Sequence, residues 1–160
     1  MTPVWWGDLG DLQALKADPR VFAIMLGGVR SPMQTADELS ADMAFWAEHG
    51  YGIWAVRDTE RGRFLGMTGM MDRPDGRGVA LRFAFLPEVQ GRGLGREAAA
   101  AALRFGHDRA GLVRIIAVAR ESNLTSRTLL GGIGMVECDE FMREGHRMLV
   151  YESVRRIYRR

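Results

Sequence analysis

The sequence has one cysteine and one lysine, and it contains no long apolar run. The single cysteine, Cys138, excludes an internal disulfide and favours a reducing compartment, so we expect a cytoplasmic protein. No apolar run approaches the ~20 residues that a membrane-spanning helix needs, and the first residues lack the basic and apolar regions of a signal peptide. The single lysine, Lys16, does not follow a glycine, which excludes the Gly-Lys-Ser/Thr phosphate loop.

The net charge is only +2. Because the chain has a single lysine, 21 of its 22 basic residues are arginine. Four of them, Arg155, Arg156, Arg159 and Arg160, lie at the C-terminus. A nucleic-acid-binding surface would need a basic stripe interleaved with aromatic residues, so we interpret this group as a solvated chain end and expect no nucleic-acid partner. The 160 residues, 47% of them apolar, are enough for one domain with its own core.

The most informative segment is a glycine-rich turn at residues 86–97, between a predicted strand and a predicted helix. Bulky apolar residues alternate along 79–86, which predicts a strand with one apolar face. Residues 97–109 are rich in alanine, the strongest helix former. Such a turn presents unpaired backbone N–H groups at the positive end of a helix dipole, and this arrangement binds phosphate.

The turn does not match a dinucleotide-binding loop, and a second glycine pattern elsewhere in the chain is better explained as a hairpin turn. A dinucleotide-binding loop needs Gly-x-Gly-x-x-Gly and an acid at the end of the next strand, but Arg96 stands where the third glycine belongs and the strand 113–119 is followed by Arg120. The segment 73–78 also carries an Arg-x-x-Gly-x-Gly pattern. It contains Pro-Asp-Gly and precedes a strand, so we predict a hairpin turn there.

The remaining motif, Gln90-x-x-Gly93-x-Gly95, resembles the acyl-CoA-binding turn of the GNAT N-acetyltransferases. A second block, Asn123-x-x-Ser126 on a helix that ends near Gly134, also resembles that family. The resemblance covers roughly residues 50–153 and is closest to the branch of ribosomal-protein N-terminal acetyltransferases. It implies an α+β GNAT fold, with a central, mixed, mostly antiparallel sheet and helices on both faces, and it implies an enzyme.

Periodicity predicts the elements of this fold in the order that the resemblance requires. We expect helices over 8–16, from 32 to about 50, over 97–109 and after Asn123, and strands over 52–57, 64–71, 79–86, 113–119, 135–141 and 146–153. Cys138, in a strand-like run, is expected to be a small buried residue.

The resemblance also implies a site for acetyl-CoA as co-substrate and requires no metal. The strand ends 83–86 and 115–119 would separate and hold the pantetheine arm, and a backbone N–H near Phe85 or Leu86 would polarise the thioester carbonyl. The residues expected to contact the cofactor are Phe85, Leu86, Gln90, Gly91, Arg92, Gly93, Leu94, Gly95, Arg96 and Asn123. Ser126 would help to protonate the departing thiolate. Simpler interpretations stay open: Asn123 as a helix cap, Ser126 as helix surface, and both arginines as solvent-exposed.

The general base is not identified by the sequence. By alignment Ala80 occupies the position where many relatives have a glutamate, and the strand 79–86 contains no carboxylate. Glu137, Glu140, His49 and Asp72 are candidates that the sequence does not place. At pH 7.5 an α-amino group of pKa ~7.8 is about one-third neutral, whereas a lysine of pKa ~10.4 is about 0.1% neutral. A weak base therefore favours an acceptor such as a protein N-terminal α-amine.

Three alternatives remain at this stage. The acceptor could be a small-molecule amine of the aminoglycoside or polyamine type, which would need an acidic cleft. The protein could be a catalytically silent CoA-binding sensor, because the strand carboxylate is missing. It could also be a basic binding module that does not use CoA. A homodimer is compatible with each.

Overall fold

The computed structural model describes residues 1–156, in which seven strands form one sheet. The sheet order is β1-β2-β3-β4-β5-β7-β6, and every neighbouring pair is antiparallel except β4 and β5. The strands are β1 (Thr2–Pro3), β2 (Ile53–Arg57), β3 (Phe64–Asp72), β4 (Val79–Phe85), β5 (Arg114–Arg120), β6 (Val136–Arg143) and β7 (His146–Val154). The expected α+β architecture, a mixed and mostly antiparallel sheet with helices on both faces, is confirmed.

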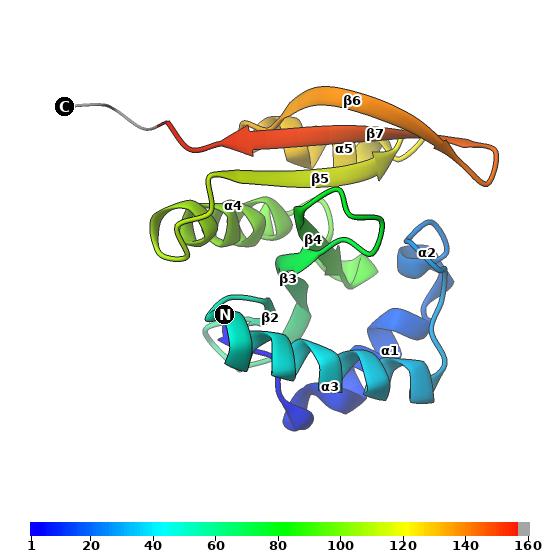
Figure 1. Ribbon diagram of the computed structural model, residues 1–160. Helices are drawn as coiled ribbons and strands as arrows, with labels where there is room; N and C mark the ends of the chain where they lie inside the picture. Colours follow the sequence, from blue (N-terminus) through cyan, green and yellow to red (C-terminus); the bar gives the residue numbers. More distant parts are fainter. Residues whose placement is uncertain (157–160) are drawn as a thin grey trace.

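Helices cover both faces of this sheet. On one face α1 (Leu9–Ala17), α2 (Pro19–Phe22) and α3 (Pro32–His49) bury a core against β2, β3 and β4, and α1 and α3 lie side by side near β2 (Figure 1). On the other face α4 (Leu94–Asp108) and α5 (Leu124–Gly132) bury a larger core against β3, β4, β5 and β7. Two short 3-10 turns complete the order, at Trp6–Asp8 and Pro87–Val89.

The longest helix, α3, has start and stop signals that follow from its sequence. Ser31 accepts a hydrogen bond from the Gln34 backbone N–H at 3.2 Å, and the Gln34 side chain accepts one from the Ser31 N–H at 2.8 Å. This reciprocal capping box encloses Pro32, whose fixed φ suits the first helical turn. The helix ends at Gly50, which adopts a left-handed φ of +72°. Leu39 on its inner face is completely buried.

The parallel strands β4 and β5 pair at a single register position, Ala80 with Ile116. Beyond that position β4 continues to Phe85 and β5 continues to Arg120, with no further pairing between them. Each strand is held along its full length by its other neighbour, β3 for β4 and β7 for β5. The two strand ends therefore diverge and leave a gap within the sheet.

Some expectations need correction. Helix α4 begins at Leu94 and not at 97, because Gly93 supplies the left-handed residue that precedes it. The expectation that Cys138 is buried is wrong: its side chain is exposed, since β6 is an edge strand with a register shift between Glu137 and Asp139. The expected solvated C-terminus is described only as far as Arg156, which is exposed; Arg159 and Arg160 lie outside the described residues.

No helix within residues 1–156 is long and apolar enough to cross a membrane.

Candidate active site

The glycine-rich turn connects the end of β4 to the start of α4 through two residues that require glycine. Gly91 and Gly93 have φ angles of +81° and +76°, in the left-handed region that side chains disfavour. Gln90 fixes the start of the turn, because its side-chain amide donates to the Phe85 carbonyl at 3.1 Å. Gly93 is the N-cap of α4, so the first backbone N–H groups of the helix follow directly after the turn.

Small residues bring the start of α4 close to the sheet. Three of its five buried residues are alanines, Ala98, Ala99 and Ala102. Gly95 lies closest to β4: a β-carbon added there would lie 3.0 Å from the Phe85 ring. The alanine-rich sequence therefore positions the positive end of the helix dipole beside the diverging strand ends.

A cavity of about 340 Å³ opens in front of this turn. It is bounded by the turn, the end of β4, the start of α5 and the α2 segment. Eight of the residues selected from the sequence line it: Phe85, Gln90, Gly91, Gly93, Gly95, Arg96, Asn123 and Ser126. The other three, Leu86, Arg92 and Leu94, do not line it.

The two candidate donors at the end of β4 are not equivalent. The Leu86 N–H already donates to the Leu65 carbonyl at 2.9 Å. Hydrogen bonds alternate in direction along an antiparallel strand, so the Phe85 N–H points away from β3, toward the gap beside β5. Of the two, only Phe85 therefore has a backbone N–H directed at the gap.

Two arginines flank the turn in different ways. Arg96 donates to the Gly132 carbonyl at 2.8 Å and so connects α4 to the last turn of α5. It also lines the cavity. Arg92 is exposed, as the simpler interpretation of this residue assumed.

Asn123 caps α5, because its side-chain oxygen accepts a hydrogen bond from the Ser126 backbone N–H at 3.1 Å. The helix-cap interpretation is thus confirmed, and it does not remove these residues from the site, since both line the large cavity. Sequence reasoning missed two further hydroxyl groups beside them, those of Thr125 and Thr128. The sequence offered one signal for them: both follow the predicted cap Asn123 closely, so they lie in the first turn and a half of the same helix.

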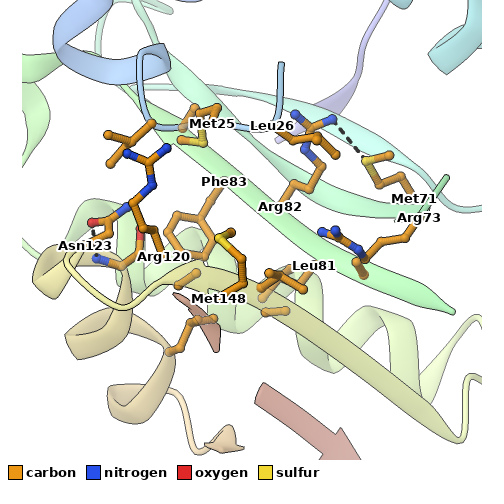
Figure 2. Close-up of a pocket in the computed structure, with 18 of the residues that line it drawn as sticks. Met25, Leu26, Met71, Arg73, Leu81, Arg82, Phe83, Arg120, Asn123 and Met148 are labelled. Atoms are coloured by element: carbon orange, nitrogen blue, oxygen red, sulfur yellow. Dashed lines mark hydrogen bonds between the residues drawn. The ribbon is translucent and has the colours of Figure 1, made fainter. Parts of the chain in front are cut away.

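A second cavity of about 90 Å³ lies where β4 and β5 separate (Figure 2). Residues that line both cavities are Ile24, Met25, Phe83, Ala84, Asn123 and Ser126. The two spaces therefore meet at the gap in the sheet. One end of the combined site is the glycine turn, and the other lies among β4, β5 and the segment after α2.

The family model described as an acetyltransferase (GNAT) domain matches residues 1–136. The chain belongs to the GNAT acetyltransferase family. Members of this family use acetyl-CoA as co-substrate. This assigns the enzyme class, and it leaves the acceptor open.

Solved structures of other GNAT acetyltransferases share this fold. A putative GNAT-family acetyltransferase from Bordetella pertussis is 23% identical, with 94% of this chain and 92% of that chain covered and a TM-score of 0.82. A spermidine N-acetyltransferase from Vibrio cholerae is 16% identical (94% and 92% covered, TM-score 0.73). A ribosomal-protein-alanine N-acetyltransferase from Brucella melitensis is 19% identical (94% and 96% covered, TM-score 0.76). Since polyamine and protein acceptors both occur among these neighbours, the expected ribosomal-protein branch is not established.

In this GNAT acetyltransferase none of the four base candidates lines either cavity. Glu137 accepts a hydrogen bond from the Tyr151 hydroxyl at 3.1 Å, and Glu140 pairs with Arg147. His49 stacks on Phe45 at the end of α3, and Asp72 is exposed at the end of β3. Within residues 1–156, no carboxylate and no imidazole lines the two cavities.

Proposed function

We propose that this GNAT acetyltransferase transfers the acetyl group of acetyl-CoA directly to a primary amine of low pKa, such as a protein N-terminal α-amine. One observation carries the proposal: a glycine turn that opens a helix leads into a large cavity, and this cavity meets a second cavity at the gap between β4 and β5. Cofactor and acceptor would approach one another at that gap, and no covalent acyl-enzyme is needed.

The backbone would provide most of the cofactor contacts. The N–H groups from Gly91 to Gly95 would bind the pyrophosphate at the N-terminus of α4. Backbone groups of β4 and β5 that lack a partner across the gap would hold the pantetheine arm, with the Asn123 side chain at its edge. The Phe85 N–H would donate to the thioester oxygen as negative charge develops there. The C–N bond would form as the C–S bond breaks, and the acetylated nitrogen would lose one proton. Ser126, which lines both cavities, would relay a proton to the departing thiolate, its hydroxyl regaining one from that nitrogen.

The absence of a base supports an acceptor that is already neutral. An amine attacks only when it is unprotonated, and the lining contains no carboxylate or imidazole within the described residues. The charged residues around the smaller cavity are arginines, and nearby cations lower the pKa of a bound amine. An α-amino group loses its proton under these conditions far more readily than a lysine side chain.

The same lining argues against a polyamine or an aminoglycoside as acceptor. Such polycations are bound by carboxylates, and the cavity beside the gap offers none within residues 1–156. The likeness to a spermidine N-acetyltransferase therefore supports the shared fold, and the residues of this cavity support a different acceptor.

A catalytically silent CoA sensor is the second candidate, because the described residues that line the two cavities include no side chain that could act as the general base. An amine panel with detection of the released thiol distinguishes the two. The panel contains matched peptides, one with a free N-terminus and blocked lysines and the other with a blocked N-terminus and free lysines. Turnover of the first peptide supports the proposal. Tight CoA binding without turnover of any amine would instead indicate a sensor.

A further inference from the structure

The smaller cavity has an unusual charge distribution. Four arginines line it, and no aspartate or glutamate does so within the described residues. The arginines come from separate parts of the chain: Arg73 from the β3–β4 turn, Arg82 from β4, Arg120 from the end of β5 and Arg143 from the end of β6. Figure 2 shows Arg73, Arg82 and Arg120 around one space that also contains Met148 and Asn123.

Arg82 has no carboxylate at hydrogen-bonding distance within residues 1–156. Its Nη1 donates to the Met71 sulfur at 3.0 Å, a weak acceptor (Figure 2). The carboxylates that act on it electrostatically are Glu38 and Asp42 on α3, and both oppose the lowering of its pKa by burial. Glu38 is already engaged by Lys16 and Arg30.

Burial disfavours the charged form of both Arg82 and its acidic neighbour Asp42. It lowers the pKa of the Arg82 guanidinium and raises the pKa of the Asp42 carboxyl. A partly desolvated cation with only a sulfur acceptor gains more from a bound anion than a hydrated surface arginine does.

Arg120 lies across the gap from β4 and is also incompletely satisfied. Its Nε is buried and has no hydrogen-bond partner in the described structure. Buried donors of this kind are rare, and each one left without an acceptor is costly. In Figure 2 the side chain extends along the cavity from beside Asn123 toward Met25. A ligand oxygen in the cavity would give this group the partner that the protein does not.

Among these four arginines, Arg73 alone makes an ion pair within residues 1–156. Asp75 in the same turn accepts hydrogen bonds from Arg73 at 2.7 and 3.0 Å. Arg143, next to the β6–β7 turn, makes no ion pair within residues 1–156. Within the described residues, one of the four guanidinium groups is thus paired directly with a carboxylate. The cavity is left with an excess of positive charge beside the proposed point of acyl transfer.

We infer that the acceptor carries an anionic group, a carboxylate or a phosphate, near its reactive amine, and that Arg82 and Arg120 bind this group. The inference rests on the proposed function, because it assigns the smaller cavity to the acceptor. Arginine presents planar, paired donors that match carboxylate and phosphate oxygens. Anchoring the anion at the arginines would place the amine at the gap, beside Ser126 and the end of β4.

Two sets of acceptors test this without changing the amine. Amidated peptides with the same N-terminal residue carry glutamate, glutamine or lysine at the second position. Glycylglycine and its amide form a small-molecule pair that differs at the carboxylate. The first set represents a protein acceptor with an acidic second residue, and the second a small amino-acid-like acceptor. We expect kcat/KM to be about tenfold or more higher for the anionic member of at least one set.

The variants Arg82→Gln and Arg120→Gln locate the effect. Each should abolish most of the preference for the anionic acceptor, measured as the ratio of kcat/KM for the anionic member of a set to kcat/KM for its neutral member. Arg120→Lys keeps a cation and should retain part of the preference. Arg104→Gln is the matched control, because it removes one arginine from the exposed surface of α4, outside both cavities. Unchanged CoA affinity shows that each variant is folded.

The possible outcomes separate the inference about the acceptor from the proposed function. A preference that disappears in Arg82→Gln and Arg120→Gln, and persists in Arg104→Gln, supports the inference. Equal turnover of anionic, neutral and cationic acceptors refutes it and leaves the proposed function intact. Preference for the lysine peptide also refutes it. Absence of turnover with every amine, despite CoA binding, refutes the proposed function itself.

Discussion

The substitution Gly93→Val tests the assignment of the glycine turn most directly. Gly93 has a φ of +76°, and a β-carbon built on it meets no heavy atom within 4 Å. The β-carbon of a valine would therefore stand in open space beside the turn. If the pyrophosphate binds there, the added atoms exclude it or force the helix N–H groups to rotate away.

The cost to stability can be separated from the cost to binding. A left-handed φ costs a side-chain-bearing residue about 1–2 kcal/mol, which in a protein of this size lowers Tm by about 2–8 °C. Gly111, in the turn between α4 and β5, has a φ of +71°, also with nothing within 4 Å of an added β-carbon. It lines neither cavity. Gly111→Val is thus a control with the same backbone strain.

Titration calorimetry with CoA on the two folded variants gives the comparison. We expect both to lose similar thermal stability, whereas only Gly93→Val should lose CoA affinity, by tenfold or more, corresponding to at least ~1.4 kcal/mol. If Gly93→Val bound CoA as tightly as Gly111→Val, the turn would not be the pyrophosphate site and the assignment of the larger cavity would be refuted.

Three further predictions concern the chemistry and the core. Ser126→Ala should lower kcat about tenfold (~1.4 kcal/mol) with CoA affinity nearly unchanged; if kcat on the true acceptor were unaffected, Ser126 would belong to the helix surface. Peptide N-termini should be acetylated in preference to lysine side chains, with kcat/KM rising with pH and levelling off near the pKa of the free acceptor, and a clear preference for lysine would point to a base outside the residues considered. Leu39→Ala, at a fully buried position of α3, should reduce the free energy of unfolding by about 2–5 kcal/mol, whereas Met33→Ala, 75% exposed on the same helix, should change it by less than ~0.5 kcal/mol in denaturant titrations.

The parts of the fold that depend on local signals could be predicted from the sequence. The cap at Ser31, the stop at Gly50 and the alternation along β4 each act within a few residues. The start of α4 was misplaced by three residues, because Glu97 looks like a first-turn residue while Gly93 supplies the actual N-cap. The prediction that Cys138 is buried was wrong, because β6 is an edge strand and the order of strands in the sheet cannot be read from the local sequence.

The candidate site was predicted in part, and the missing part depends on tertiary structure. The turn and Asn123 are contiguous motifs, so a single sequence reveals them. The arginines of the smaller cavity are far apart in the chain, and only the divergence of β4 from β5 brings Arg82 and Arg120 to one space. In the sequence Arg82 was merely the one charged residue in an apolar strand. For the same reason, the sequence could not predict that Glu137 and Glu140 do not line the cavities.

The gap between β4 and β5 also affects how the sheet avoids aggregation. An unpaired strand edge can template pairing with another chain, and here two such edges face one another inside the molecule. The outer edges are protected by other means. At one side β1 has only two residues, one of them Pro3. At the other, β6 carries four charged residues and a register irregularity after Glu137. The facing unpaired edges of β4 and β5 thus lie inside the sheet, beside the cavity that a small ligand would occupy.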